Sequence, residues 1–236
     1  MENQDSKLPF TANPSPAIPL WQFGLLASLL PLLTIHLTLL VSFWQDALPH
    51  CNPYWLDCVS ISATGRYGLA YFLFKAGMIP AMVLLALFWT LNSYWLKSLG
   101  LGSQRYLGWL GVVASLALIV YSLSLGHVGE TFYLLRRAGV VIYLGLTFIA
   151  QACLGAALAS HPSRPMSRSG RRLLLFSALT LFIAIFSLAL DGLWPVWHER
   201  MEDAFEWWLV LLLNLHAVWV AVLWRRLGFV ARMGVR

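Results

Sequence analysis

The last apolar run of the chain constrains the fold more than any other stretch. From Ala204 to Trp224 it is long enough, at about 1.5 Å per residue, to cross a hydrocarbon core of roughly 30 Å as one helix. It also contains Asn214 and His216, polar groups whose burial in lipid costs free energy unless neighbouring helices supply hydrogen-bond partners. We therefore expect this helix to belong to a bundle and both side chains to bond to neighbouring helices.

Five further apolar runs complete such a bundle. Hydrophobic residues make up 59% of the sequence and charged residues only 11%, which is typical of an integral membrane protein. None of the runs shows the alternating pattern of a barrel strand. The sequence predicts an all-α fold, a polytopic membrane bundle of six transmembrane helices at residues 20–44, 67–95, 109–125, 138–159, 173–193 and 204–224. Residues 1–19 and 227–236 remain as tails, the first of them irregular, and there is no room for a separate soluble domain.

The basic residues predict the orientation of the bundle. Eleven Lys and Arg fall on the side that holds both tails, and five fall on the other side. Positive charge is retained in the cytoplasm, so we expect both termini to be cytoplasmic and the first, third and fifth connections to lie outside. The basic residues are mostly juxtamembrane, which fits contact with anionic headgroups and excludes nucleic acid as a partner. We expect a plasma or bacterial inner membrane.

Two cysteines fall in the first outer connection. Cys51 and Cys58 are seven positions apart, and a pair of this kind forms a disulfide in an oxidising compartment. The alternative is a metal site that uses both thiols and His50, but the spacing is not a zinc signature. A disulfide is the favoured interpretation.

Ionisable side chains gather at the predicted outer end of the bundle. Lys75 lies about 12 Å along its helix from Tyr67, and Arg136 and Arg137 open the fourth span from the same side. Nearly all acidic residues lie on this side, namely Asp46, Asp57, Glu130, Asp191, Glu199, Glu202, Asp203 and Glu206. The outer half of the bundle is therefore expected to form a polar cup of mixed charge.

Two explanations fit this cup. It either consists of structural ion pairs or binds a lipid headgroup, in which case Lys75, Arg136 or Arg137 holds a phosphate and Glu206 or Asp191 holds an amine or a sugar hydroxyl. Tryptophans gather largely at span ends and in the outer loops, as interfacial belts do. Trp207 stands beside the acids, where an aromatic rim suits either ordinary anchoring or cation–π contact with a choline headgroup.

Catalytic and redox alternatives have weaker support in the sequence. His127, Glu130 and His198, together with an aspartate, are candidate zinc ligands, and Ser60 or Ser62 is a candidate nucleophile, but no spacing enforces either chemistry. Two histidines lie inside spans, at positions 36 and 216, as in b-type cytochromes. Lone histidines of this kind more often pack and hydrogen-bond within the bundle, so we predict no metal and no cofactor.

Three segments resemble one family of six-span membrane proteins. They are CVSISATGRYGLAYFLFKAGMIPA from Cys58, FYLLRRAGVVIYLGLTFIAQ from Phe132 and MEDAFEWWLVLLLNLHAVW from Met201. Together they resemble the Frag/DRAM/Sfk-type family, which includes the damage-regulated autophagy modulators and the Golgi factor for lipid remodelling of GPI anchors. Six spans with both termini cytoplasmic also match.

The resemblance implies particular positions of interest, and it also shows a departure. The implied positions are Ser60, Ser62, Thr64, Gly65, Glu206 and Trp207. A His–Asp pair that the family has at the start of the fourth span appears here as Arg136 and Arg137. Any proton chemistry of that pair in relatives is therefore not carried over.

The sequence thus favours a membrane protein that binds or organises lipid in the outer half of the bilayer, with membrane lipids as partners. The resemblance implies an accessory factor in lipid or lipid-anchor remodelling, and the pattern of site residues favours a protein that is not an enzyme. One alternative is an intramembrane lipid hydrolase or acyltransferase that uses the outer acidic and histidine cluster. The other is a structural subunit that docks another membrane protein.

Overall fold

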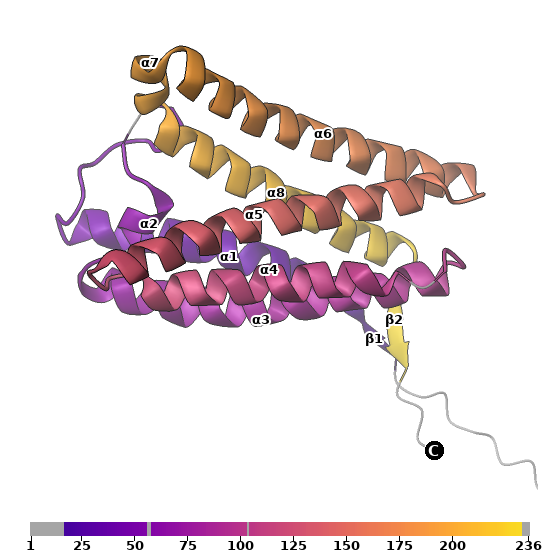
Figure 1. The fold of residues 1–236 in the computed structure, drawn as a ribbon. Coiled ribbons are helices and arrows are strands. Elements are labelled where there is room, and N and C mark those ends of the chain that lie inside the picture. The colour runs from indigo at the N-terminus through magenta and orange to yellow at the C-terminus, as the bar shows by residue number, and fades with distance from the viewer. Residues whose placement is uncertain (1–16, 56–57, 103, 233–236) are drawn as a thin grey trace, which may run out of the picture.

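The structure is a computed structural model, and it describes residues 17–55, 58–102 and 104–232. Within that part of the chain, six helices are long and apolar enough to cross a membrane, as the sequence predicts. Most of the predicted first tail, the end of the second tail and Asp57 of the predicted cup lie outside the described residues. The fold is an all-α membrane bundle (Figure 1).

The six long helices have 20 to 31 residues, which corresponds to roughly 30 to 46 Å. They are α1 (Leu20–Trp44), α3 (Gly68–Ser98), α4 (Arg105–Ser124), α5 (Glu130–Ala159), α6 (Arg164–Leu193) and α8 (Glu202–Arg226). Two short helices, α2 (Ile61–Thr64) and α7 (Pro195–Glu199), lie in connections. Several long helices extend beyond the predicted apolar runs, because helical hydrogen bonding continues where the side chains become polar.

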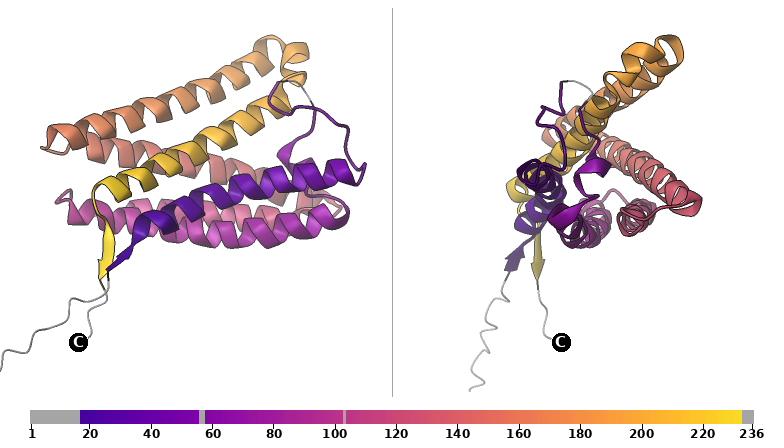
Figure 2. Two further views of the ribbon diagram at one scale, coloured as in Figure 1. Left: turned by 180° about the vertical axis from the view of Figure 1, so that it is seen from behind. Right: turned by 90° about the vertical axis from the view of Figure 1, so that its left-hand side faces the viewer.

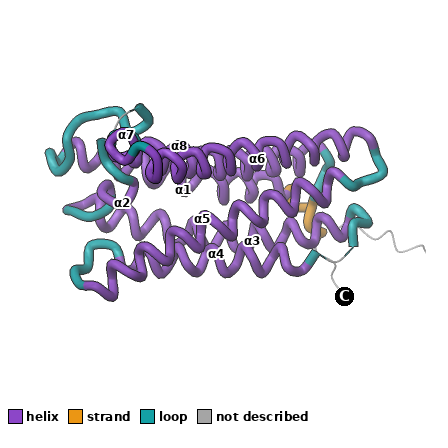
Figure 3. Tube along the Cα trace, turned by 45° about the horizontal axis from the view of Figure 1, so that its top comes forward, coloured by secondary structure: helices purple, strands orange, loops and turns teal. Residues whose placement is uncertain are grey.

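The long helices form a closed ring in the order α1, α3, α4, α5, α6, α8. The loops gather at its two ends (Figure 3). We call the end with α2, α7 and the connection that contains Cys51 and Cys58 the loop end. The opposite end, where the chain enters α1 and leaves α8, is the strand end (Figure 2).

Two short strands join the tails at the strand end. Strand β1 (Ala17–Pro19) pairs antiparallel with β2 (Val230–Arg232), and Leu20 N–H donates to the Phe229 carbonyl at 3.2 Å. The Phe229 ring packs on Trp224, with 5.2 Å between ring centroids. The described ends of the chain are therefore fastened together and are not irregular. Strands of three residues show no alternating pattern, so the sequence did not reveal this pairing.

Helices α5 and α6 are close at the strand end and diverge towards the loop end (Figure 1). Two glycines permit the close approach. A Cβ added to Gly155 would lie 2.9 Å from the Leu174 nitrogen, and one added to Gly170 would overlap the backbone of Ala159. As a result of the divergence, α6 is the least enclosed long helix, with 17% of its most apolar window buried against 33% to 56% in the others.

Four tryptophans lie in the core rather than in an interfacial belt. Trp89, Trp95, Trp207 and Trp224 are each at most 1% exposed. Gly111 makes room for one of them, since an added Cβ there would overlap the Trp89 side chain. The exposed tryptophans, such as Trp44 and Trp109, follow the expected belt.

The expectation that Asn214 and His216 bond to neighbouring helices is wrong. Asn214 Nδ2 donates to the Val210 carbonyl of its own helix at 2.7 Å, and neither ring nitrogen of His216 has a hydrogen-bond partner among the described residues. Another side chain makes the expected link between helices. Gln151 of α5 donates its Nε2 to the Leu213 carbonyl of α8 at 2.8 Å.

Candidate functional site

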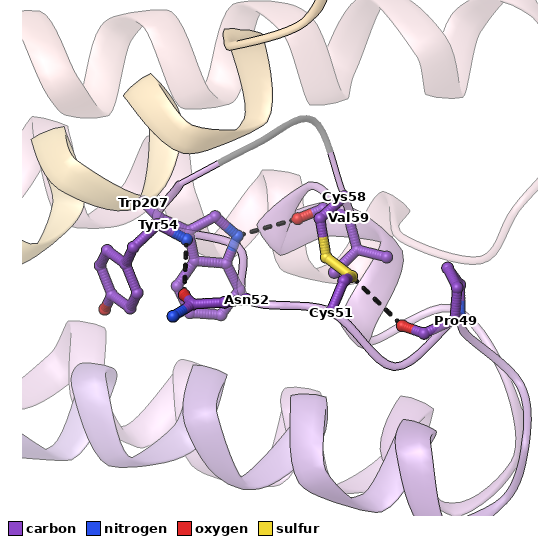
Figure 4. The surroundings of a disulfide bond; sticks show 7 residues. All are labelled: Pro49, Cys51, Asn52, Tyr54, Cys58, Val59 and Trp207. Carbon is purple, nitrogen blue, oxygen red and sulfur yellow. Dashed lines mark hydrogen bonds between the residues drawn. A yellow bond between two sulfur atoms is a disulfide. The ribbon is translucent and has the colours of Figure 1, made fainter.

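A disulfide closes the first connection at the loop end. Cys51 and Cys58 are joined as the sequence predicts, with their Cα atoms 6.0 Å apart (Figure 4). The remaining cysteine, Cys153, is half-buried in α5 and free. The bridge limits the conformations of the loop that precedes α2.

Two indoles of α8 hold this loop against the bundle. Trp207 Nε1 donates to the Val59 carbonyl at 2.9 Å, and Trp208 Nε1 donates to the Tyr54 carbonyl at the same distance. Figure 4 shows Trp207 beside the disulfide loop. Because Trp207 is fully buried, its side chain is a structural anchor and does not form an exposed aromatic rim.

His36 of α1 contacts the same loop beside Trp207, with 5.3 Å between the two ring centroids. Its Nδ1 lies 2.7 Å from the Leu32 carbonyl and its Nε2 lies 2.9 Å from the Tyr54 hydroxyl. Burial raises the pKa of Tyr54, which keeps the phenol neutral. His216, the other candidate haem ligand, is buried beside Phe176 of α6. The two histidines thus have different surroundings and separate packing roles.

The short helix α2 binds directly to α8. Ser60 caps α2 by accepting the Ala63 N–H at 3.2 Å, and Glu206 Oε2 accepts the Ile61 N–H at 3.0 Å. Both interactions satisfy first-turn N–H groups that have no partner within the helix. Thr64 at the other end of α2 lies 3.0 Å from Thr38 of α1, oxygen to oxygen. Helix α2 is therefore fixed between α1 and α8.

The positions implied by the family resemblance lie close together around α2. Ser60 Oγ and Ser62 Oγ are 3.0 Å apart, and Ser62 Oγ also accepts a 2.6 Å hydrogen bond from Arg66. Gly65 is required because an added Cβ would overlap the ring of Phe74. In the described part of the chain neither serine hydrogen-bonds to a histidine, and the carboxylate bound to α2 is that of Glu206, which accepts the Ile61 N–H.

A small cavity of about 40 Å³ lies at the centre of the bundle next to α2. Residues from α1, α2, α3, α4, α5 and α8 line it, and most of them are apolar. The polar members of the lining are Tyr121, Tyr143, Asn214 and Glu206. Glu206 is half-buried, and its second oxygen, Oε1, has no hydrogen-bond partner among the described residues. This leaves one carboxylate oxygen available beside an apolar cavity.

The cations of the predicted cup divide between two roles. Lys75 donates to the Tyr71 hydroxyl and to the Leu123 carbonyl, and Arg136 donates to the Ser124 carbonyl at 3.1 Å. These carbonyls belong to the last turn of α4, where helix carbonyls lack partners and the helix dipole favours cations. Arg137 is exposed and makes no such contact with the described residues.

The two acids predicted as alternative headgroup ligands, Asp191 and Glu206, have different partners. Asp191 lies 3.5 Å from Nδ1 of His198, whose Nε2 is 3.2 Å from the Ser187 hydroxyl. His127 instead stacks on Phe132 at the start of α5. Among the described residues, no group of three His, Cys, Asp or Glu side chains is placed to hold a metal ion, so His127, Glu130 and His198 do not form a cluster.

Comparison with protein-family models, curated proteins and solved structures finds no match. The contacts described above define the candidate site as Glu206, helix α2 and the cavity beside them. Sequence reasoning missed Tyr121 and Tyr143 as members of this site. Their signal was a tyrosine well inside a span, which favours an inward-facing hydroxyl.

Proposed function

We propose that this integral membrane protein binds a lipid at the loop end through Glu206. The observation that carries the proposal is the asymmetry of this carboxylate. Oε2 is fixed by the Ile61 N–H, whereas Oε1 has no partner among the described residues and stands beside a mostly apolar cavity. An ionisable side chain inside a membrane span is costly and is a functional candidate by default.

The chemistry of a carboxylate selects the group that it would hold. A carboxylate accepts hydrogen bonds, so its ligand must donate one, as an amine or a hydroxyl does. Two more acids, Glu202 and Asp203, act electrostatically on Glu206 and favour a cation. A cavity of about 40 Å³ has room for a group the size of a few water molecules, not for a whole headgroup. An ammonium group, as in phosphatidylethanolamine, meets these conditions.

The remainder of such a lipid would extend between α5 and α6. These helices diverge at the loop end, and the outer half of α6 carries exposed apolar side chains, including Phe182 and Ile185. Arg137, the predicted phosphate ligand that remains exposed, is located at the start of α5. With both termini in the cytoplasm, as the basic residues predict, this lipid belongs to the outer leaflet.

Membership of the Frag/DRAM/Sfk-type family, with a role as an accessory factor in lipid or lipid-anchor remodelling, is part of the same proposal. Its support is the gathering of Ser60, Ser62 and Gly65 around α2, next to Glu206. A hydrolase or acyltransferase is less well supported, because the Ser62 hydroxyl is engaged by Ser60 and Arg66.

A second candidate function is docking of another membrane protein on α6. The observation in its favour is the low burial of this helix, 17% of its apolar window. A helix partner on α6 would cover the same apolar side chains that the lipid would contact. Purification of a fixed partner that is retained after Glu206 is replaced would favour docking over lipid binding.

The lipid proposal is tested by native mass spectrometry of the full chain in detergent. Delipidated protein is offered phosphatidylethanolamine or phosphatidylcholine, whose quaternary headgroup has no N–H to donate. We expect retention of phosphatidylethanolamine by the wild type and its loss in Glu206→Gln, which keeps one oxygen for Ile61 N–H. Glu199→Gln removes an exposed acid from the short helix α7 at the same end of the bundle and serves as the control. Equal retention by wild type and Glu206→Gln would overturn the proposal.

A further inference from the structure

We propose a second lipid site at the strand end, a groove between α3 and α4 that binds the phosphate of an anionic phospholipid. The groove has a volume of about 460 Å³ and is separate from the cavity at Glu206. It therefore does not depend on the function proposed above. This volume is within the usual range of sites for small organic ligands and exceeds what a single ion requires.

Residues on one face of α3 and on one face of α4 line the groove. Thr90, Ser93 and Lys97 line it from the last turns of α3. Gly108 and Val112 line it from the first turns of α4. Residues at these spacings share one face of a helix. Gly108 permits α3 and α4 to approach each other along the groove, since an added Cβ would lie 3.2 Å from the Ser93 hydroxyl oxygen.

Two cations in the lining of the groove have no ion-pair partner among the described residues. Lys97 is in the last turn of α3 and Arg105 is the first residue of α4. Both side chains line the groove, and neither makes an ion pair or a hydrogen bond with the described residues. The groove thus presents a double positive charge that no acid of the described chain compensates.

The start of α4 strengthens this charge. Arg105 occupies the positive end of the helix dipole, where a cation is unfavourable, and no acid lies in the first turn. Gln104 does not cap the helix with its side chain, so among the described residues the N–H groups of Arg105 and Tyr106 have no side-chain acceptor, whereas the Leu107 N–H donates to the Gln104 carbonyl. A phosphate bound here would satisfy both the cations and the N–H groups.

The walls of the groove indicate a lipid as the source of that phosphate. Tyr94 and Trp109 are 63% and 69% exposed on its two sides, as aromatic side chains at a headgroup level are. Further along, the lining becomes apolar at Val112, which suits the start of an acyl chain. The strand end is the predicted cytoplasmic side, whose leaflet holds anionic lipids that basic pockets between helices bind.

Native mass spectrometry of the full chain with phosphatidylglycerol or phosphatidylcholine tests this site. We expect the wild type to retain phosphatidylglycerol preferentially and K97Q/R105Q to retain it roughly 25-fold less, since each basic side chain near an anionic surface contributes a factor of roughly five. The control R168Q/R172Q removes two exposed cations from α6. It should remain within about twofold of the wild type. An equal loss in both double variants would show general surface charge and would overturn the proposal.

A steric variant separates the groove from its charges. Val112→Trp fills the groove and leaves both cations in place, so it should also reduce retention of phosphatidylglycerol. Unchanged retention would exclude the groove as the binding site. Inorganic phosphate distinguishes the two sources of the ligand: if it raises the melting temperature of the wild type as much as phosphatidylglycerol does, the site takes free phosphate and the lipid proposal fails. Circular dichroism of each variant verifies that the helices are intact.

Discussion

Glu206 of α8 accepts a hydrogen bond of 3.0 Å from the backbone N–H of Ile61, 145 positions earlier in the chain. This contact joins the last membrane helix to the short helix that follows the disulfide loop. One turn of α8 therefore fixes α2 and also places Glu206 in the lining of the central cavity, with Oε1 lacking a hydrogen-bond partner among the described residues. The structural and the proposed ligand-binding roles of Glu206 belong to different oxygens of one side chain.

Trp207→Phe should destabilise the protein by about 1–3 kcal/mol, because it leaves the Val59 carbonyl without its indole donor inside the fold. Thermal unfolding in detergent measures the effect. Trp208→Phe is the matched control, since its indole makes a similar bond to Tyr54 but the side chain is 38% exposed. Water can replace that bond, so we expect a smaller change. A larger loss in the control would contradict the anchoring role of Trp207.

The disulfide predicts a definite pattern of thiol labelling. In unreduced, denatured protein only Cys153 should react, and reduction should add two more sites. Replacing Cys51 and Cys58 by serine should cost about 2.5 kcal/mol by the entropy of closing so short a loop. Labelling of three cysteines without reduction would show that the bridge is not formed.

Gly170→Ala should separate α5 from α6 at the strand end, because the added Cβ overlaps the backbone of Leu158 and Ala159. We expect a loss of about 1–3 kcal/mol, as overpacked positions show. Gly145→Ala in α5 is the control, since an added Cβ there has no neighbour within 4 Å. Helix propensity predicts a neutral or slightly stabilising effect for it. Equal melting temperatures for the two variants would contradict the close packing at Gly170.

Arg136 and Arg137 should respond differently to the same substitution. Arg136→Gln removes the donor to the Ser124 and His127 carbonyls and should cost about 1 kcal/mol of stability. Arg137→Gln should leave the melting temperature unchanged, because Arg137 is exposed and has no partner among the described residues. It should instead weaken retention of the lipid that we propose to bind at Glu206. Identical behaviour of the two variants would remove the distinction between a structural and a ligand-binding arginine.

The helices and the disulfide were predictable because long apolar runs and cysteine spacing are local features of the sequence. The arrangement of the ionisable side chains was not. Lys75 and Glu206 both lie near the loop end. Lys75 donates to a carbonyl at the end of α4, whereas Glu206 accepts from an N–H at the start of α2. Which backbone groups lack partners depends on where each helix ends in space. Charge patterns along the sequence contain no such information.

The pairing of the two tails was also not predictable from the sequence. Ala17 and Arg232 are paired across almost the whole length of the chain, and three-residue strands have no recognisable pattern. Trp89 and Trp224 are similar cases, since a tryptophan in a span is compatible with either an interface or a core. Only the glycines and neighbouring rings against which they pack decide between the two.

The most direct test of the account is an experimental density map of the wild type in phosphatidylethanolamine nanodiscs, compared with Glu206→Gln. We predict headgroup density within hydrogen-bonding distance of Glu206 Oε1 in the wild type, with acyl density between α5 and α6, and loss of both in the variant while the Ile61 contact remains. Density for water alone beside Oε1 in the wild type, or a protein donor bonded to that oxygen, would contradict lipid binding at Glu206.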